Sequence, residues 1–234
     1  MPGIARPSTA RAHNNSTCLS SRTKRMHNAS PIVTFEKISA ASRQPVLWKN
    51  RGGVTREIAR QASTRDDTFD WRVSVADVDQ PGPFSTFEHV DRILVVIRGD
   101  QMVIRRDDTA LRLACWEPYA FPGEAPITAH LPSGPTRDFN LMVRRAHGRG
   151  SVHVHRDAES LAMTDGTAVL YCATGAFSIR ALDDDGAPVE LEEGDALRID
   201  LDADMAFDVQ PTRADSVLID ARIVPFVRAT RPSA

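Results

Sequence analysis

Two groups of polar side chains in this sequence have types and spacing that suit chemistry. The first centres on Arg92, which precedes the five apolar residues 93–97. An arginine buried alone at the mouth of a pocket is costly, and a carboxylate that accepts two hydrogen bonds relieves that cost. Each such charge-assisted contact contributes roughly 1.5–3 kcal/mol. The sequence therefore indicates a site for a small acid at Arg92, with a structural ion pair to Asp91 or Glu57 as the alternative.

Other residues of the first half have the chemistry to complete such a site. Lys49, Asn50 and Thr55 offer an ammonium, an amide and a hydroxyl, which suit an amino-acid-like acid. Arg72 and Ser74 occupy alternate positions in the segment 69–78, so they share one face if it forms a strand. A solvated sheet face explains the same alternation. The candidate ligand-binding residues are Arg92, Lys49, Asn50, Thr55, Glu57, Arg72 and Ser74.

The second group consists of His153, His155 and Glu159, which are candidates for metal ligands. Two histidines two positions apart on a strand project from the same face, as a metal site requires. Solvent-facing histidines explain the same spacing, and we assign no metal and no cofactor. We also assign no catalytic residue, because the nucleophile candidates Ser85 and Cys115 have no base partner that the sequence identifies.

The elements that would position these residues are short strands. Apolar, β-branched runs recur at intervals of roughly 8–12 residues and are separated by turn sequences, a pattern typical of an all-β barrel or sandwich. One short segment, 156–162, has a helix-like pattern. The runs 93–99 and 169–175 both lead from a buried strand through a glycine into another strand, which suggests a duplicated barrel. Predicted strands cover 32–38, 54–58, 69–78, 93–97, 102–105, 111–113, 127–131, 151–155, 168–173, 176–180, 196–201, 205–209 and 216–224.

Charge and composition exclude several classes of protein. The chain has 29 basic and 31 acidic residues, and residues 1–31 contain five of the basic residues and no acidic one. The rest of the chain is therefore acidic, which argues against nucleic acid as a partner. No apolar run approaches the ~20 residues of a membrane span. Three cysteines without a CxxC motif favour a reduced, cytoplasmic protein. Residues 1–31 are expected to be a disordered basic extension, with a targeting segment or a true start at Met26 as the alternatives.

Several ordered motifs resemble the HutD/Ves family over about residues 32–228. They are the segments 48–58 (WKNRGGVTREI), 69–74 (FDWRVS), 82–87 (GPFSTF), 91–92 (DR) before Gly99, 121–124 (FPGE) and 138–145 (DFNLMVRR). The family pattern has three glycines after the asparagine, whereas this chain has Arg51 in the first of these places. The side chain of Arg51 either alters the rim of a pocket or faces water.

The resemblance implies a bicupin, in which one chain forms two cupin-like barrels. The first barrel is expected at 32–137, the second at 138–228 with exchange of strands left open, and a tail at 229–234. In metal-binding cupins a glutamate ligand stands seven residues before the barrel glycine, and counting back from Gly99 puts Arg92 in that place. A cation there repels a metal ion and attracts a carboxylate, so the resemblance implies no metal in the first barrel.

The resemblance also implies a link to bacterial histidine utilisation. On this interpretation the protein is a non-catalytic sensor or regulator that binds an acidic intermediate such as formyl- or formimino-glutamate. Two alternatives stay open. One is a cupin-type enzyme that acts on a small carboxylate, with His153, His155 and Glu159 if a metal is present. The other is a protein-interaction module that binds another component of the pathway. A homodimer is compatible with each of these functions.

Overall fold

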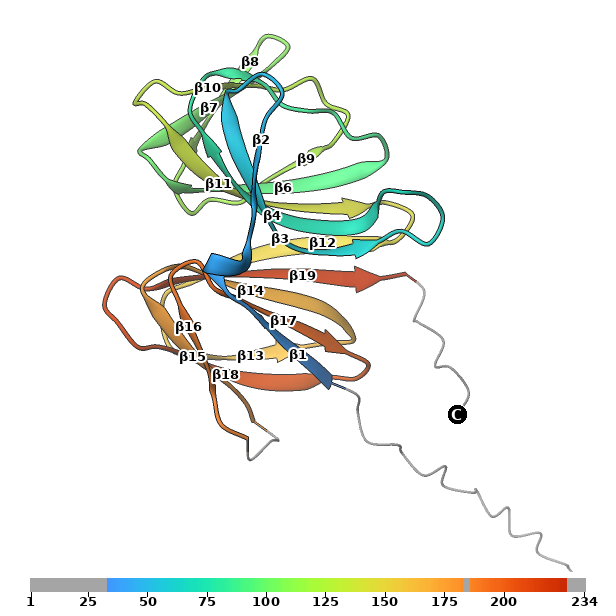
Figure 1. Cartoon of the computed structure of the whole chain (residues 1–234), viewed down its shortest axis with the longest axis vertical. Helices are drawn as coiled ribbons and strands as arrows, with labels where there is room; N and C mark the ends of the chain where they lie inside the picture. The colour runs from blue at the N-terminus through green and yellow to red at the C-terminus, as the bar shows by residue number, and fades with distance from the viewer. Residues whose placement is uncertain (1–32, 183–185, 227–234) are drawn as a thin grey trace, which may run out of the picture. The chain divides into compact units, whose positions relative to one another are not determined.

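The computed structural model describes residues 33–182 and 186–226, which form strands and one short 3-10 helix, η1 (Ala40–Ser42) (Figure 1). The predicted all-β class is therefore confirmed. None of the described residues belongs to a helix with the length and apolar character needed to cross a membrane. The predicted basic extension over 1–31 and the predicted tail over 229–234 lie outside the described residues.

The first half of the described chain forms two antiparallel sheets. The six-stranded sheet has the spatial order β2 (Pro45–Leu47), β3 (Gly53–Ala62), β4 (Phe69–Val78), β11 (Thr136–Arg144), β6 (Val90–Arg98) and β9 (Tyr119–Pro122). The four-stranded sheet has the order β5 (Gly82–Pro83), β10 (Thr128–His130), β7 (Gln101–Arg106) and β8 (Thr109–Ala114). Between them lies a core that includes Leu94, Met102 and Ile127.

The second half of the fold, which also contains the first strand of the chain, repeats this plan. Its five-stranded sheet has the order β1 (Val33–Ile38), β17 (Ala196–Leu201), β14 (Gly166–Thr174), β19 (Val217–Pro225) and β12 (Gly148–His155). Its four-stranded sheet has the order β13 (Glu159–Met163), β18 (Met205–Pro211), β15 (Ala176–Ala181) and β16 (Val189–Glu192). Leu170, Phe177 and Phe207 belong to the core between these two sheets.

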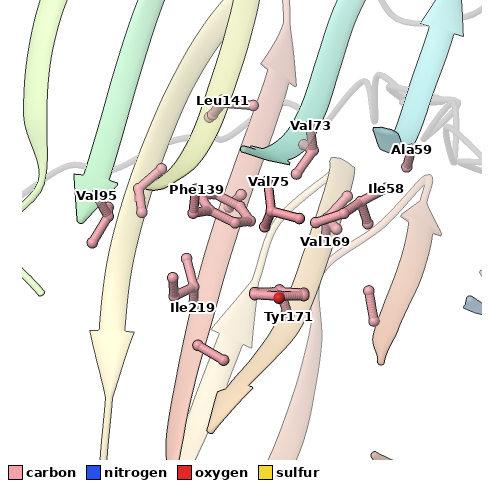
Figure 2. Close-up of a cluster of buried hydrophobic side chains, with 14 of the residues drawn as sticks. Ile58, Ala59, Val73, Val75, Val95, Phe139, Leu141, Val169, Tyr171 and Ile219 are labelled. Carbon is pink, nitrogen blue, oxygen red and sulfur yellow. The ribbon is translucent and has the colours of Figure 1, made fainter. Parts of the chain in front are cut away.

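A third core joins the six-stranded sheet to the five-stranded sheet (Figure 2). Phe139 and Leu141 of β11 contribute to it, together with Tyr171 of β14 and Ile219 of β19. The ring centroids of Phe139 and Tyr171 are 5.6 Å apart. Successive side chains of a strand point to opposite faces. Because Phe139 and Leu141 face the third core, Asp138, Asn140 and Met142 of β11 point toward the interior of the first half.

Two glycines mark corresponding points of the two halves. Gly99 follows β6 and has a φ of +95°, and Gly175 follows β14 and has a φ of +73°. A Cβ atom on Gly99 would lie 2.9 Å from the side chain of Thr136, and one on Gly175 would lie 2.2 Å from the hydroxyl of Ser216. The similar runs 93–99 and 169–175 therefore occupy similar local structures. Two closed barrels stay a prediction, because the strand pairings give four separate sheets.

We expect Gly175→Ala to lower the free energy of unfolding by about 2–4 kcal/mol, because the new Cβ adds both a left-handed backbone penalty and an overlap with Ser216. Gly134→Ala is the matched control. Gly134 has a φ of +97°, but a Cβ atom added there would meet no other atom within 4 Å, so only the backbone penalty applies. Urea denaturation of the two variants measures the difference. Equal losses would show that the close approach at Ser216 is unimportant.

Three sequence-based expectations differ from the observed strands. The segment 156–162 is not helical, because Glu159–Met163 forms β13, which pairs with β18 and buries Leu161 and Met163. The expected boundary at 137/138 falls inside β11, which is hydrogen-bonded between β4 and β6 and so belongs to the first half. The first strand, β1, pairs with β17 of the second half, whereas β2 pairs with β3 of the first.

Candidate functional site

Arg92 lies on β6 with its side chain inside the first half, and only 5% of the residue is exposed. The guanidinium carbon lies 5.4, 5.5 and 4.9 Å from the ring centroids of Phe84, Phe87 and Phe121. Nη1 donates a hydrogen bond to the backbone oxygen of Ser85 at 3.1 Å. Nε is buried and has no hydrogen-bond partner among the described residues. Aromatic faces thus hold a cation whose Nε–H donor is free.

The proposed ion pair between Arg92 and a neighbouring acid is wrong. The Asp91 carboxylate instead accepts a hydrogen bond from Arg145 Nε at 2.7 Å, since strand alternation turns Asp91 to the opposite face from Arg92. The Glu57 carboxylate accepts a hydrogen bond from Arg72 Nε at 2.8 Å. No carboxylate in the described part of the chain forms a hydrogen bond with Arg92, so its guanidinium has no bonded counter-charge there.

Asp138 and Asn140 accompany Arg92, although neither is among the predicted ligand-binding residues. Both lie inside β11, where Asp138 is 2% and Asn140 is 5% exposed. The Oδ1 atom of each is buried and has no hydrogen-bond partner in the described chain. Their alternation with Phe139 and Leu141 is the sequence signal that would have placed them on the inward face. Ser74, Arg92, Asp138 and Asn140, all buried on this face, are called the Arg92 cluster below.

The charges of the cluster influence each other in an environment of low dielectric constant. Burial raises the pKa of Asp138 to about 7, and the charge of Arg92 opposes this rise. Burial likewise lowers the pKa of Arg92 to about 10, while Asp138 raises it and Arg72 lowers it further. Burial is therefore the larger influence on both residues. An Asp138 carboxyl with this pKa exchanges its proton near neutral pH.

Other predicted ligand-binding residues lie on the same sheet at different distances from Arg92 along the strands. Ser74 of β4 pairs with Asn140 of β11. Arg72 of β4 and Arg92 of β6 pair with the same β11 residue, Met142, from its two sides, so they lie in one row across the sheet. Glu57 lies opposite Ser74 on β3. Thr55 is one alternate position further on the same strand, where its hydroxyl accepts a hydrogen bond from Trp48 Nε1 at 2.8 Å. Sheet register therefore brings these four predicted residues to the inward face, where Ser74 is buried and the other three are half-buried.

Lys49 and Asn50 have a different setting. They lie in the turn between β2 and β3, where Asn50 Oδ1 accepts a hydrogen bond from the backbone N–H of Gly52 at 3.0 Å. No hydrogen bond or ion pair within the described chain joins either residue to the Arg92 cluster. Arg51 in the same turn has a φ of 57°, the left-handed region that glycine adopts without penalty. The backbone conformation therefore explains the glycine of the family pattern at this position. The side chain of Arg51 is exposed.

A cavity of about 450 Å³ lies against the opposite face of β6, β9 and β11. Arg92 and Phe121 contribute to its wall, but most of the lining side chains, such as Ile93, Leu141 and Val143, are apolar. Gly150 of β12 closes it on the other side. Because Arg92 packs its guanidinium among aromatic rings on the inward face, this cavity is distinct from the polar atoms of the cluster.

The two histidines of the second predicted group have separate environments. His155 Nδ1 lies 2.5 Å from Glu159 Oε1, and Nε2 lies 3.6 Å from Asp220 Oδ2. Asp220 is fully buried and also accepts a hydrogen bond from Arg222 Nε at 2.7 Å. His153 is exposed. The guanidinium of Arg222 already neutralises Asp220. His155, Glu159, Asp220 and Arg222 therefore form an ion-pair network.

No group of three or more His, Cys, Asp or Glu side chains within residues 33–182 and 186–226 is arranged to hold a metal ion. The sequence did not single out Asp220, because a lone acid within the apolar run 217–223 gives no indication of which strand its side chain faces. His155, Glu159 and Asp220 come from three strands, and only the fold brings them together.

The His155 network gives an expected dependence of stability on pH. Asp220 first, and then Glu159, raise the pKa of His155, although burial opposes them. A raised pKa means that this contribution is complete below about pH 6.5 and is lost as the pH rises through the folded-state pKa. We expect His155→Gln to lose about 1 kcal/mol of stability in mild acid and less in alkali. Melting temperatures of the unmodified protein and of His155→Gln from mild acid to alkali test this expectation, with His153→Gln as the control. A loss of stability that does not depend on pH would contradict it.

Comparison with solved structures shows the fold class. Protein Ylba from Escherichia coli, which is assigned to DUF861, superposes with a TM-score of 0.60 at 11% identity, over 84% of this chain and 95% of that one. At this identity the likeness concerns the fold alone. HutD from Pseudomonas fluorescens SBW25, in a structure from a formate condition, has a TM-score of 0.70 at 27% identity. The superposition covers 82% of this chain and 100% of that one.

Sequence comparison gives the family. An uncharacterised 21.2 kDa protein in the hutC 3′ region of Pseudomonas putida is 36% identical over 128 residues, which are 54% of this chain and 67% of that protein. Protein Ves from Cronobacter sakazakii is 33% identical over 135 residues, 57% of this chain and 73% of that protein. The sequence model of the HutD family matches residues 39–217. The chain therefore belongs to the HutD family, as its ordered motifs predicted.

Proposed function

We propose that this protein binds a small carboxylic acid at the Arg92 cluster and regulates histidine utilisation without catalysing a reaction. The observation that carries the proposal is the buried guanidinium of Arg92, which has a free Nε donor and no carboxylate bound to it within the described residues. A carboxylate is the group that such a cation binds best, because its two oxygens match the guanidinium fork. The unpaired oxygens of Asp138 and Asn140 would accept hydrogen bonds from N–H or O–H groups of the ligand.

The link to histidine utilisation comes from the relatives. The family carries the name HutD, and the relative from Pseudomonas putida is described by its position beside hutC. An acidic intermediate of that pathway, such as formyl- or formimino-glutamate, supplies both a carboxylate and N–H donors. The metal-dependent enzyme is less well supported, because His155 and Glu159 are bound to each other and Asp220 is bound to Arg222.

A thermal-shift screen tests the proposal, because a ligand that binds only the folded state raises the melting temperature. The panel contains histidine, urocanate, formimino-glutamate, formyl-glutamate, glutamate and divalent metal ions. We expect a shift with an acidic intermediate that is lost in Arg92→Ala. A shift with metal ions alone, lost in His153→Ala, would favour the enzyme. No shift with any compound would favour a protein-interaction module.

A further inference from the structure

Three buried polar atoms of the Arg92 cluster have no hydrogen-bond partner within the described residues. One is a donor, Arg92 Nε, and two are acceptors, Asp138 Oδ1 and Asn140 Oδ1. Asn140 pairs with Leu94, so it lies two positions along the sheet from the row of Arg92 and two from the row of Asp138. Asp138 is therefore four positions, or roughly 13 Å of strand, from the row of Arg92, a separation that the long arginine side chain shortens. The two charges influence each other, so an acid bound by Arg92 would add a negative charge to the same buried interior as the Asp138 carboxyl.

Most charges around Asp138 are already balanced by neighbours. On the inward face, β3, β4 and β6 present Glu57, Arg72 and Arg92 to this part of the interior. Strand alternation places Asp77, Arg56 and Arg137 on the opposite face, from which Asp77 still raises the pKa of Asp138. Arg72 pairs with Glu57 at 2.8 Å, and Asp77 pairs with both Arg56 and Arg137. Within this set, Arg92 is the cation without a carboxylate bonded to it. It therefore supplies the positive charge that partly balances an ionised Asp138.

An arriving carboxylate places a second negative charge beside the same guanidinium. Two carboxylates that share one buried site cannot both stay ionised cheaply, and one of them takes up a proton. Asp138 is the acceptor of that proton, because it is fully buried and its pKa is already raised to about 7. Once neutral, Asp138 no longer repels the bound acid.

We propose that binding of a small carboxylate at Arg92 is coupled to the uptake of one proton by Asp138. This inference rests on the proposed function, since it concerns the same site. It adds a consequence that the function alone does not require: the protein responds to pH as well as to its ligand. After the proton is taken up, the bound acid and Asp138 together carry one negative charge.

Calorimetric titration with formate tests the coupling. Formate is the smallest carboxylate, and its own carboxyl stays ionised over the range from about pH 5.5 to 8.5. We expect the Kd of the unmodified protein to rise, above the pKa of Asp138, by up to about tenfold per pH unit. Two buffers of different ionisation enthalpy should reveal the uptake of up to one proton per formate bound. Asp138→Asn should bind formate with a Kd that changes little with pH.

Control variants separate this inference from the proposed function. Asp108→Asn, an exposed carboxylate in the turn before β8, should keep the pH dependence of the unmodified protein. Formate binding that requires Arg92 but does not vary with pH, or that varies equally in Asp138→Asn, would overturn the coupling and leave the acid site intact. Failure of the unmodified protein and of Asp138→Asn to bind formate at any pH would overturn the carboxylate site together with the coupling.

Discussion

Asp138→Asn should stabilise the unliganded protein at neutral and alkaline pH. Asp138 has a pKa raised to about 7 by burial, above the ordinary value of 3.8. The folded state therefore holds a proton that the unfolded state releases between these values, and stability falls as the pH rises through this window. Above about pH 7 the cost of the buried carboxylate is fully present, and its removal should contribute about 3 kcal/mol. Near pH 4 and below, the variant should gain almost nothing.

Urea denaturation at several pH values measures this gain. Asp77→Asn is an informative control, because hydrogen bonds from Arg137 and Arg56 outweigh burial and lower the pKa of Asp77. Its replacement should therefore destabilise the protein at neutral pH, the opposite sign. If Asp138→Asn were less stable than the unmodified protein at pH 8, the buried carboxylate would be a stabilising partner of Arg92 rather than a cost.

Arg92→Met should reduce the affinity for the acidic ligand by at least about 100-fold, because two charge-assisted hydrogen bonds are lost. Methionine is unbranched and packs well against aromatic rings, so it should fill the space among Phe84, Phe87 and Phe121. Arg92→Lys keeps the charge but not the planar fork, and we expect a smaller loss. Titration calorimetry with the best ligand of the thermal-shift screen measures both.

The exposed Arg112 of β8 provides the control for charge alone, and Arg112→Met should leave the affinity unchanged. Circular dichroism checks that each variant is folded. An Arg92→Met protein that binds the acid as tightly as the unmodified one would remove Arg92 from the site and, with it, the carboxylate-binding function.

Local pattern predicted much of the fold. The period-two alternation of residues 69–78 predicted a strand that coincides with β4, and the same alternation predicted that Arg72 and Ser74 share a face. Arg92 could be singled out because a charge directly before a long apolar run is unusual, and because of its place before Gly99. The pairing of β1 with β17 depends on contacts more than 150 residues apart, for which one sequence carries no signal.

The site was harder to predict than the fold. Asp138 and Asn140 alternate with Phe139 and Leu141, yet two polar residues near a predicted boundary look like a turn. Their burial follows from the position of β11 between β4 and β6, which no local pattern reveals. Asn50 has the chemistry of a ligand-binding residue but caps its own turn, because a short Asn side chain reaches the backbone two residues on. Polar type alone therefore does not separate binding from local structure.

The pairing of β1 with the second half affects how the chain folds while it is synthesised on the ribosome. The segment 33–38 leaves the ribosome before the rest of the described chain, but its partner strand, 196–201, follows some 160 residues later. Until residues 196–201 are synthesised, β1 has no partner strand. In contrast, β2, which begins only seven residues further on, can join the sheet of the first half. Completion of the second half should therefore close the whole structure in one late, concerted step. Either half expressed as a separate fragment should be prone to aggregation through its unpaired strand edges.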